Sequence, residues 1–188
     1  RSRLNMLDAG VSIIEESMMA TEAFLKARSG WNAVINADAA IREATALAEE
    51  MSKENILASQ AKGNEALAFL EEAQQDFSQA EAAYLSLDLA AFKAYVAKRI
   101  ESQQAALAAD EAYLSRNKEE LEAQNSRYNA LEEEAAALAQ ELGEDDPEQI
   151  VALRFYKEIE ADQGAYEAER LKAGNADAFL REYLGTAS

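Results

Sequence analysis

The chain has 188 residues, with 36 acidic and 18 basic side chains and neither His nor Cys. The length suits one domain. Without imidazole or thiol, a Ser-His-Asp triad, a thiolate nucleophile, a zinc finger and a disulfide are excluded. The net charge of −18 opposes binding to nucleic acid or anionic lipid, because both are polyanions.

The composition predicts a single all-α domain over residues 1–188. Ala alone accounts for 42 residues, whereas Val and Ile together account for 12, and the chain holds one Pro and seven Gly. Ala, Leu, Glu and Gln favour helices, and residues that favour strands are scarce. So few helix breakers indicate long helices joined by short turns.

The first predicted helix covers residues 4–28 and ends at Ser29–Gly30, where Gly can close a helix. Its apolar side chains recur in steps of three and four, which is typical of a stripe that faces a core or a partner helix. This seam consists of Leu4, Leu7, Val11, Ile14, Met18, Thr21 and Leu25.

Two further helices are expected over residues 32–62 and 64–86. Between them, Gly63–Asn64 is either a tight turn or a kink in one long helix, and the sequence leaves both readings open. Ser86–Asp88 is predicted to form a tip, with Asp88 as the N-cap of the next helix.

The longest uninterrupted pattern spans residues 89–142, without Gly or Pro. A strict period of seven indicates left-handed supercoiling. After it, Asp146 and Pro147 begin a helix expected over 147–173, and a short helix is expected over 176–184. The period-seven positions are Ile100, Leu107, Leu114, Leu121, Tyr128, Ala135 and Leu142.

These lengths predict an elongated antiparallel helical bundle or coiled coil. Residues 32–86 would pair with 88–142, and the shorter helices 4–28 and 147–173 would attach at the end opposite the Ser86–Asp88 tip. The result would be a four-helix bundle at one end and a two-helix stalk at the other. If Gly63 were a true turn, the bundle would be more compact.

Half of the long seam is polar, at Gln103, Asp110, Asn117 and Gln124. Buried polar seam positions can fix register and partner number. Three interpretations stay open for them: rotation toward water, assembly, or the lining of a ligand pocket.

Aromatic side chains gather around the predicted stalk, and two helices alone cannot cover so many rings. Packing on one another in a core is the favoured interpretation, and a partner or dimer surface is the alternative. The four central rings are Phe77, Tyr84, Phe92 and Tyr95.

The sequence predicts no enzyme, cofactor or metal site. Carboxylate pairs are inevitable among 36 acidic residues, and the chain has no Gly-rich phosphate loop or nucleophile elbow. The acidic turn Glu144–Glu148 lacks the ligand spacing of a calcium loop, and it is interpreted as a charged helix start.

Stretches such as Ala109–Leu114 and Phe92–Tyr95 place tyrosines at helical spacing in an Ala- and Glu-rich background. In this texture the chain resembles the helical domains of bacterial cell-envelope lipoproteins and surface proteins. The resemblance implies a structural or protein-interaction module outside the cytoplasm, with a protein partner or self-association and a lipid anchor upstream. A cytoplasmic location is the alternative.

Two other functions are weighed against this one. A small-ligand sensor bundle would use a pocket between the helices. A lipid-binding bundle would use the seam from Leu4 to Leu25 as an opening amphipathic face. Neither nucleic acid nor a transmembrane segment is expected.

Overall fold

The computed structural model describes residues 2–84, 87–158, 160, 161, 164, 167 and 168. Four long helices follow one another, and no strand occurs among these residues. The predicted all-α, elongated antiparallel bundle is therefore confirmed. The helices are α1 (Ser2–Glu49), α2 (Lys53–Ala83), α3 (Ala90–Leu114) and α4 (Lys118–Leu142), and residues 147–158 are also helical.

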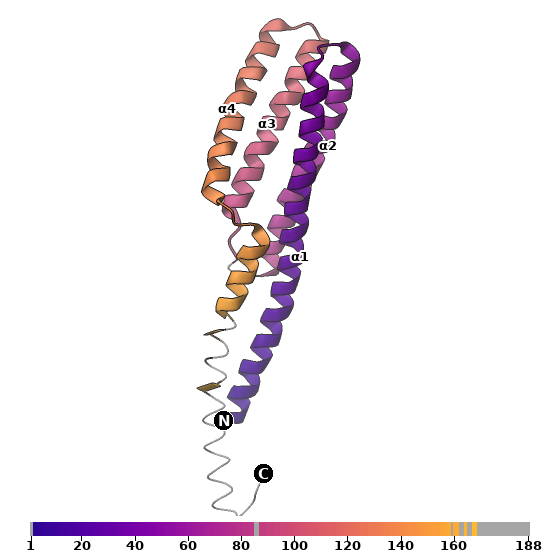
Figure 1. Cartoon of the computed structure of the whole chain (residues 1–188). Coiled ribbons are helices and arrows are strands. Elements are labelled where there is room, and N and C mark those ends of the chain that lie inside the picture. Colours follow the sequence, from indigo (N-terminus) through magenta and orange to yellow (C-terminus); the bar gives the residue numbers. More distant parts are fainter. Residues whose placement is uncertain (1, 85–86, 159, 162–163, 165–166, 169–188) are drawn as a thin grey trace, which may run out of the picture.

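Figure 1 shows how these helices divide the molecule into two parts. The second half of α1 lies with α2, α3 and α4 in a four-helix bundle, and each helix runs antiparallel to the next. Beyond the bundle, the first half of α1 continues beside residues 147–158. We call this two-helix part, residues 8–25 with 147–158, the stalk. With 48 residues, α1 extends over about 70 Å and joins the two parts.

The contact between α1 and α2 is built mainly from small side chains. Along α2, buried residues recur in steps of three and four from Ile56 to Ala80, with Asp76 as an additional buried residue, and Ser59 reaches α1 through its hydrogen bond to the Ala44 carbonyl. Along α1, the facing residues are mostly alanines. Short side chains let two helices approach to the lower end of the usual 8–10 Å separation. The buried residues on this side of α1 are Ala20, which also lines a groove with helix 147–158, and Ala23, Ala27, Gly30, Val34, Ala37 and Ala44.

Two glycines that the sequence marks as breaks lie inside helices. The predicted end at Ser29–Gly30 is wrong, because α1 continues through it, and Gly63 lies within α2, so the turn reading is excluded. A Cβ on Gly30 would stand 2.7 Å from the Phe77 ring, and one on Gly63 would stand 2.8 Å from Leu107. Both glycines therefore serve close helix contacts, which outweigh their low helix propensity of about 1 kcal/mol.

The predicted helix over residues 32–62 is interrupted at residues 50–52, where α1 turns back into α2. The Ser52 hydroxyl accepts a hydrogen bond from the Asn55 backbone N–H at 3.2 Å, and the Asn55 side chain donates to Glu50 at 2.7 Å. A serine N-cap satisfies an amide that the helix leaves free. This cap fixes a hairpin at a position without Gly or Pro.

The predicted helix over 89–142 is also wrong, because the chain reverses at residues 115–117 between α3 and α4. Arg116 adopts a positive φ of 57°. The Asn117 N–H bonds to the Ala112 carbonyl at 2.8 Å and the Arg116 N–H to the Tyr113 carbonyl at 3.1 Å, which is a Schellman motif. Asn117 then caps α4 by accepting from the Glu120 N–H at 3.1 Å.

The other predicted helix ends lie close to the observed ones. The α2 helix ends at Ala83, and α3 begins at Ala90 with Leu89 as its N-cap. Asp88 still accepts a hydrogen bond from the Ala90 N–H at 2.9 Å. Helix 147–158 begins as predicted, with the Asp146 carboxylate accepting from Gln149 at 3.0 Å. The expected end near residue 173 and the helix 176–184 lie outside the described residues.

The apolar seam expected in the first helix faces away from the core. Val11, Ile14, Met18 and Leu25 are 51–69% exposed, whereas the alanines on the opposite side of α1 are buried. The side chains of Leu4 and Leu7 lie outside the described residues. The prediction that this stripe forms the packing seam is wrong for its described part, because alanines allow a closer approach to α2 than branched side chains would.

The stalk is also made from other segments than predicted. The Ser86–Asp88 tip was expected at the free end of the molecule, but Leu87 and Asp88 line a pocket together with Ile150 and Leu153 of helix 147–158, where the bundle meets the stalk. The two unpredicted turns, at residues 50–52 and 115–117, lie together at the opposite end of the bundle. They halve the expected pair of long helices and so produce four shorter bundle segments.

Gly30→Ala is expected to destabilise the protein by about 1–2 kcal/mol. The added methyl must displace the fully buried Phe77 ring, and this overpacking outweighs the gain in helix propensity. Urea unfolding followed by circular dichroism measures the change. Gly63→Ala is the matched control, because its methyl meets only the flexible ends of Leu107 and Gln103. Equal stability of both variants would contradict the proposed ring contact.

Arg116→Gly is expected to stabilise the protein by about 0.5–1 kcal/mol. Glycine adopts the positive φ at this position without the penalty that an L side chain carries, and part of that gain is offset by a more flexible unfolded chain. Arg116→Ala removes the same side chain but keeps the penalty, so its stability should match the wild type. A gain of the same size for Arg116→Ala would refute the explanation by backbone strain.

Candidate functional site

The four central aromatic residues pack inside the chain's own core. Phe77, Tyr84, Phe92 and Tyr95 are all buried, and the Phe77 and Phe92 ring centroids lie 6.1 Å apart. Trp31 of α1 meets Phe92 edge-on at 5.7 Å, and Arg154 lies over the Tyr84 ring at 5.6 Å. The favoured core-packing interpretation is confirmed for these four rings.

The four polar seam residues do not form one group. Gln103 and Asp110 lie on the inner side of α3, where Gln103 is buried and Asp110 is partly buried. Asn117 is the exposed N-cap of α4, and the Gln124 amide donates to Glu120 at 2.8 Å on the same helix. The chain reversal at residues 115–117 separates the two pairs.

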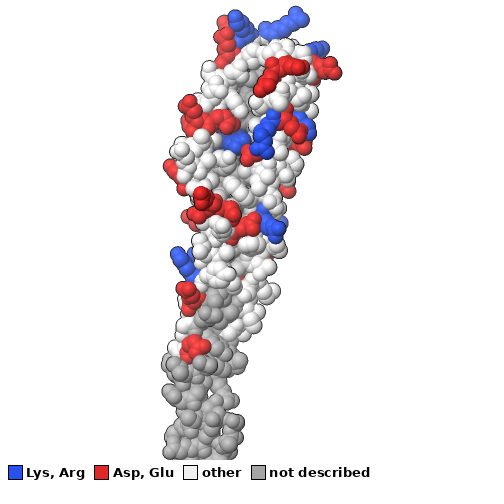
Figure 2. Space-filling view, in the orientation of Figure 1, with Lys and Arg blue, Asp and Glu red and all other residues white. Residues whose placement is uncertain are grey.

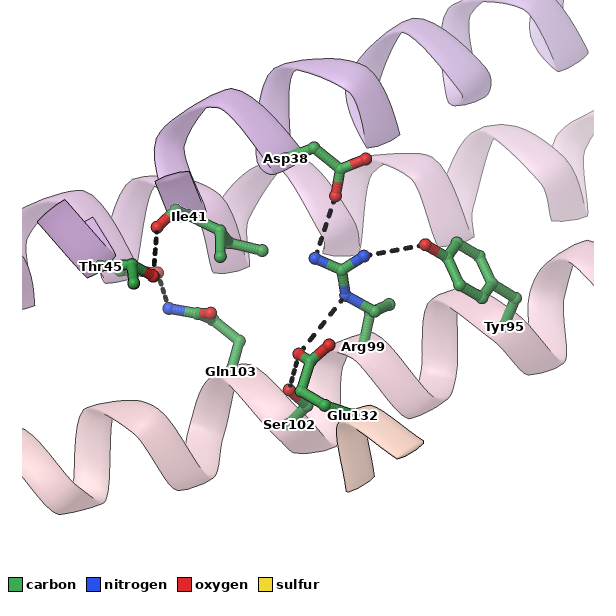
Figure 3. Close-up of polar contacts among 9 residues, drawn as sticks. Asp38, Ile41, Thr45, Tyr95, Arg99, Ser102, Gln103 and Glu132 are labelled. Atoms are coloured by element: carbon green, nitrogen blue, oxygen red, sulfur yellow. Dashed lines mark hydrogen bonds and ion pairs between the residues drawn. The ribbon is translucent and has the colours of Figure 1, made fainter. Parts of the chain in front are cut away.

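An arginine that the sequence did not single out links three helices (Figure 3). The Arg99 guanidinium of α3 lies 2.9 Å from Asp38 of α1 and donates to the Tyr95 hydroxyl at 2.8 Å. Its Nε lies 3.8 Å from Glu132 of α4, whose carboxylate also accepts from the Ser102 hydroxyl. With its side chain only 12% exposed, Arg99 has two carboxylates that offset its burial. This network links three helices of the bundle, although the Arg99 Nε is buried without a hydrogen-bond partner of its own.

A small open pocket of about 170 Å³ lies between the bundle helices beside this network. All four helices line it. The Ser59 hydroxyl, with its single proton, lies within hydrogen-bond distance of both the Ala44 carbonyl, at 2.9 Å, and the Asp110 carboxylate, at 3.4 Å. Gln103 donates to the Gly63 carbonyl at 3.4 Å. Its polar lining is formed by Thr45, Ser59, Gln103, Asp110, Asn125 and Tyr128.

The chemistry of this pocket is limited by its single ionisable carboxylate. Burial raises the pKa of Asp110 to about 6, and the hydrogen bond from Ser59 offsets part of that rise. One carboxylate cannot supply the three or four ligands that a structural or catalytic metal requires. Among the described residues, no cluster of three acidic side chains is arranged to hold a metal ion.

The apolar face of the stalk lies on the surface, whereas the sequence predicted that it packs inside the bundle. Besides the exposed row on α1, a groove of about 280 Å³ runs between α1 and helix 147–158. Phe24 and Leu25 line one side, and Phe155 and Tyr156 line the other. Figure 2 shows that the charged side chains visible on its face gather mainly over the bundle. The alanines at positions 20, 23 and 27 were the signal that α1 has two apolar faces, of which only one could be internal.

Comparison with protein-family models, curated proteins and solved structures finds no match to this chain. Among the described residues, no helix combines the length and apolar character needed to cross a lipid bilayer. The physical features of the chain itself must therefore support any function proposed for it.

Asp110→Asn is expected to stabilise the protein by about 1 kcal/mol near pH 8 and to have little effect near pH 4. The pKa of Asp110 is higher in the folded protein than the usual 3.8, so the fold favours the protonated carboxyl. Its stabilising contribution is complete below the unfolded pKa and is lost as the pH rises through about 6. Asn is neutral throughout and avoids this loss.

Unfolding free energies measured across that pH range test the prediction. Asp88→Asn is the control, because Asp88 is exposed and neutralising it should not reproduce the same profile. If Asp110→Asn shifts stability equally at both ends of the range, titration of Asp110 is not the cause.

Proposed function

We propose that this chain is a non-enzymatic structural or protein-interaction helical bundle. The observation that carries the proposal is the row of large apolar side chains on α1. Val11, Ile14, Met18 and Leu25 stay more than half exposed although their spacing suits helix packing. A contiguous exposed apolar surface marks an interaction site more often than an accident of folding.

The available side-chain chemistry supports a non-catalytic role. The chain has no imidazole or thiol, and the small pocket between the bundle helices contains one carboxylate among neutral groups. General acid–base catalysis needs a positioned pair of groups within hydrogen-bond reach of a substrate. The buried Arg99 is already held by Asp38, Glu132 and Tyr95.

We further propose that the chain belongs to a bacterial extracytoplasmic or cell-envelope protein. The Ala- and Glu-rich helical composition, with 42 Ala, supports this location. Fractionation of cells that express the full-length protein tests it, and recovery only in the cytosolic fraction would argue for the alternative compartment.

Light scattering combined with affinity capture from envelope extract tests the proposed function. We expect either self-association or a partner that is retained by the wild-type chain and lost with Met18→Ser. Because Met18 is 69% exposed, this variant should keep the wild-type unfolding temperature. A strictly monomeric chain that captures nothing would contradict the proposal.

A lipid-binding bundle remains the second candidate, because the apolar row on α1 is exposed without any opening of the bundle. Binding to vesicles of neutral phosphatidylcholine, with loss in the Met18→Ser variant, would support it.

A further inference from the structure

The outer face of the stalk has the geometry of a helix-binding surface. Val11, Ile14, Met18 and Leu25 follow one another in steps of three, four and seven, and Thr21 fills the position between the last two. A seven-residue repeat keeps such a row facing one partner helix. Residues 11–25 extend over about 21 Å, or roughly four turns.

The groove beside this row widens the surface. It separates Phe24 and Leu25 from Phe155 and Tyr156, and no charged side chain lines it. Tyr156 is 62% exposed. An amphipathic helix laid along α1 would therefore cover apolar atoms of both stalk helices at once.

One edge of the row is acidic. Asp8, Glu15 and Glu22 follow one another at intervals of seven residues, and all three are exposed. None of them forms a hydrogen bond or an ion pair with the described residues. In contrast, Lys62 and Lys98 of the bundle each contact two carboxylates. Charges that flank an apolar helix seam select the partner.

We propose that the outer face of the stalk binds an amphipathic helix of another protein that carries Lys or Arg along one flank. The proposal rests on the proposed function as an interaction module and specifies its partner. The partner's apolar side chains would cover the row from Val11 to Leu25. Its cations would lie beside Asp8, Glu15 and Glu22 and form ion pairs with these carboxylates.

A second copy of the chain fits this surface less well. In an antiparallel pair the acidic edge would face itself, and in a parallel pair Asp8, Glu15 and Glu22 would face the positions of Arg3, Gly10 and Ser17 of the other copy. Self-association would therefore supply a cation to Asp8 at most, and none to Glu15 or Glu22. Two copies would also bring together net charges of −18 each.

Binding of two designed helical peptides to the full chain tests the proposal. Both have three heptads with Leu in the seam, and they differ only in carrying Lys or Glu along the flank. Fluorescence anisotropy with labelled peptide at low nanomolar concentration keeps the peptides themselves monomeric. We expect the Lys peptide to bind at least tenfold more tightly than the Glu peptide, with a difference that shrinks as salt is added.

Variants of the protein locate the binding. Ile14→Ser combined with Met18→Ser should weaken the Lys peptide at least tenfold, because buried apolar contacts dominate such interfaces. Met51→Ser with Leu57→Ser, also exposed but distant, should not. Glu15→Gln with Glu22→Gln should weaken binding about fivefold, whereas Glu71→Gln with Glu133→Gln, with the same change in net charge, should have no effect.

Each opposing result overturns the proposal in a distinct way. Equal binding of both peptides, or equal loss with both pairs of Glu→Gln changes, refutes the acidic edge as the selector but leaves an interaction module standing. A dimer that Ile14→Ser with Met18→Ser dissociates assigns the face to a second copy, and binding to phosphatidylcholine vesicles assigns it to lipid. Absence of all binding overturns the proposal, and the capture from envelope extract then decides the proposed function separately.

Discussion

The close contact between α1 and α2 is the constraint on which the rest of the structure depends. Alanines from Ala20 to Ala44 bury little apolar area each, so this seam gains stability only if the two helices approach closely and many atoms meet at once. Gly30 lets the Phe77 ring lie against the α1 backbone. In the same way, Gly63 lets the Leu107 side chain of α3 lie against the α2 backbone. Any wider spacing would leave the alanines without contacts and the aromatic core loosely packed.

That constraint also explains the division into bundle and stalk. Because α1 continues through Gly30, it is far longer than its neighbours, and its first half extends beyond the end of α2. There it packs beside helix 147–158, which covers only part of its circumference. The large side chains Ile14, Met18 and Leu25 consequently remain exposed, beside carboxylates that form no ion pair with the residues the structure describes. The interaction surface proposed for this protein is thus a consequence of the length of one helix.

The polar residues of the bundle have a different role from the one that their heptad spacing first indicated. Arg99 joins three helices through two carboxylates and a phenol, and Gln103 and Asp110 line a small open pocket between the helices. Such groups are costly to bury, so they can favour one helix arrangement over others that leave them unpaired. Asn117 contributes differently, because its side chain begins a helix.

The sequence by itself determined the all-α class, the long helices, the start of helix 147–158 at Pro147 and the aromatic core around Phe77 and Phe92, because composition, capping residues and apolar periodicity act locally. It could not determine where the chain reverses. The turn at Arg116 depends on an L residue held at positive φ, and the capping signals at Ser52 and Asn117 lie within patterns that also suit an uninterrupted helix. Only the tertiary structure decided which of the two apolar faces of α1 is internal. Periodicity reports that a face is apolar, whereas packing selects the face whose side chains are small enough to bring the neighbouring backbone close.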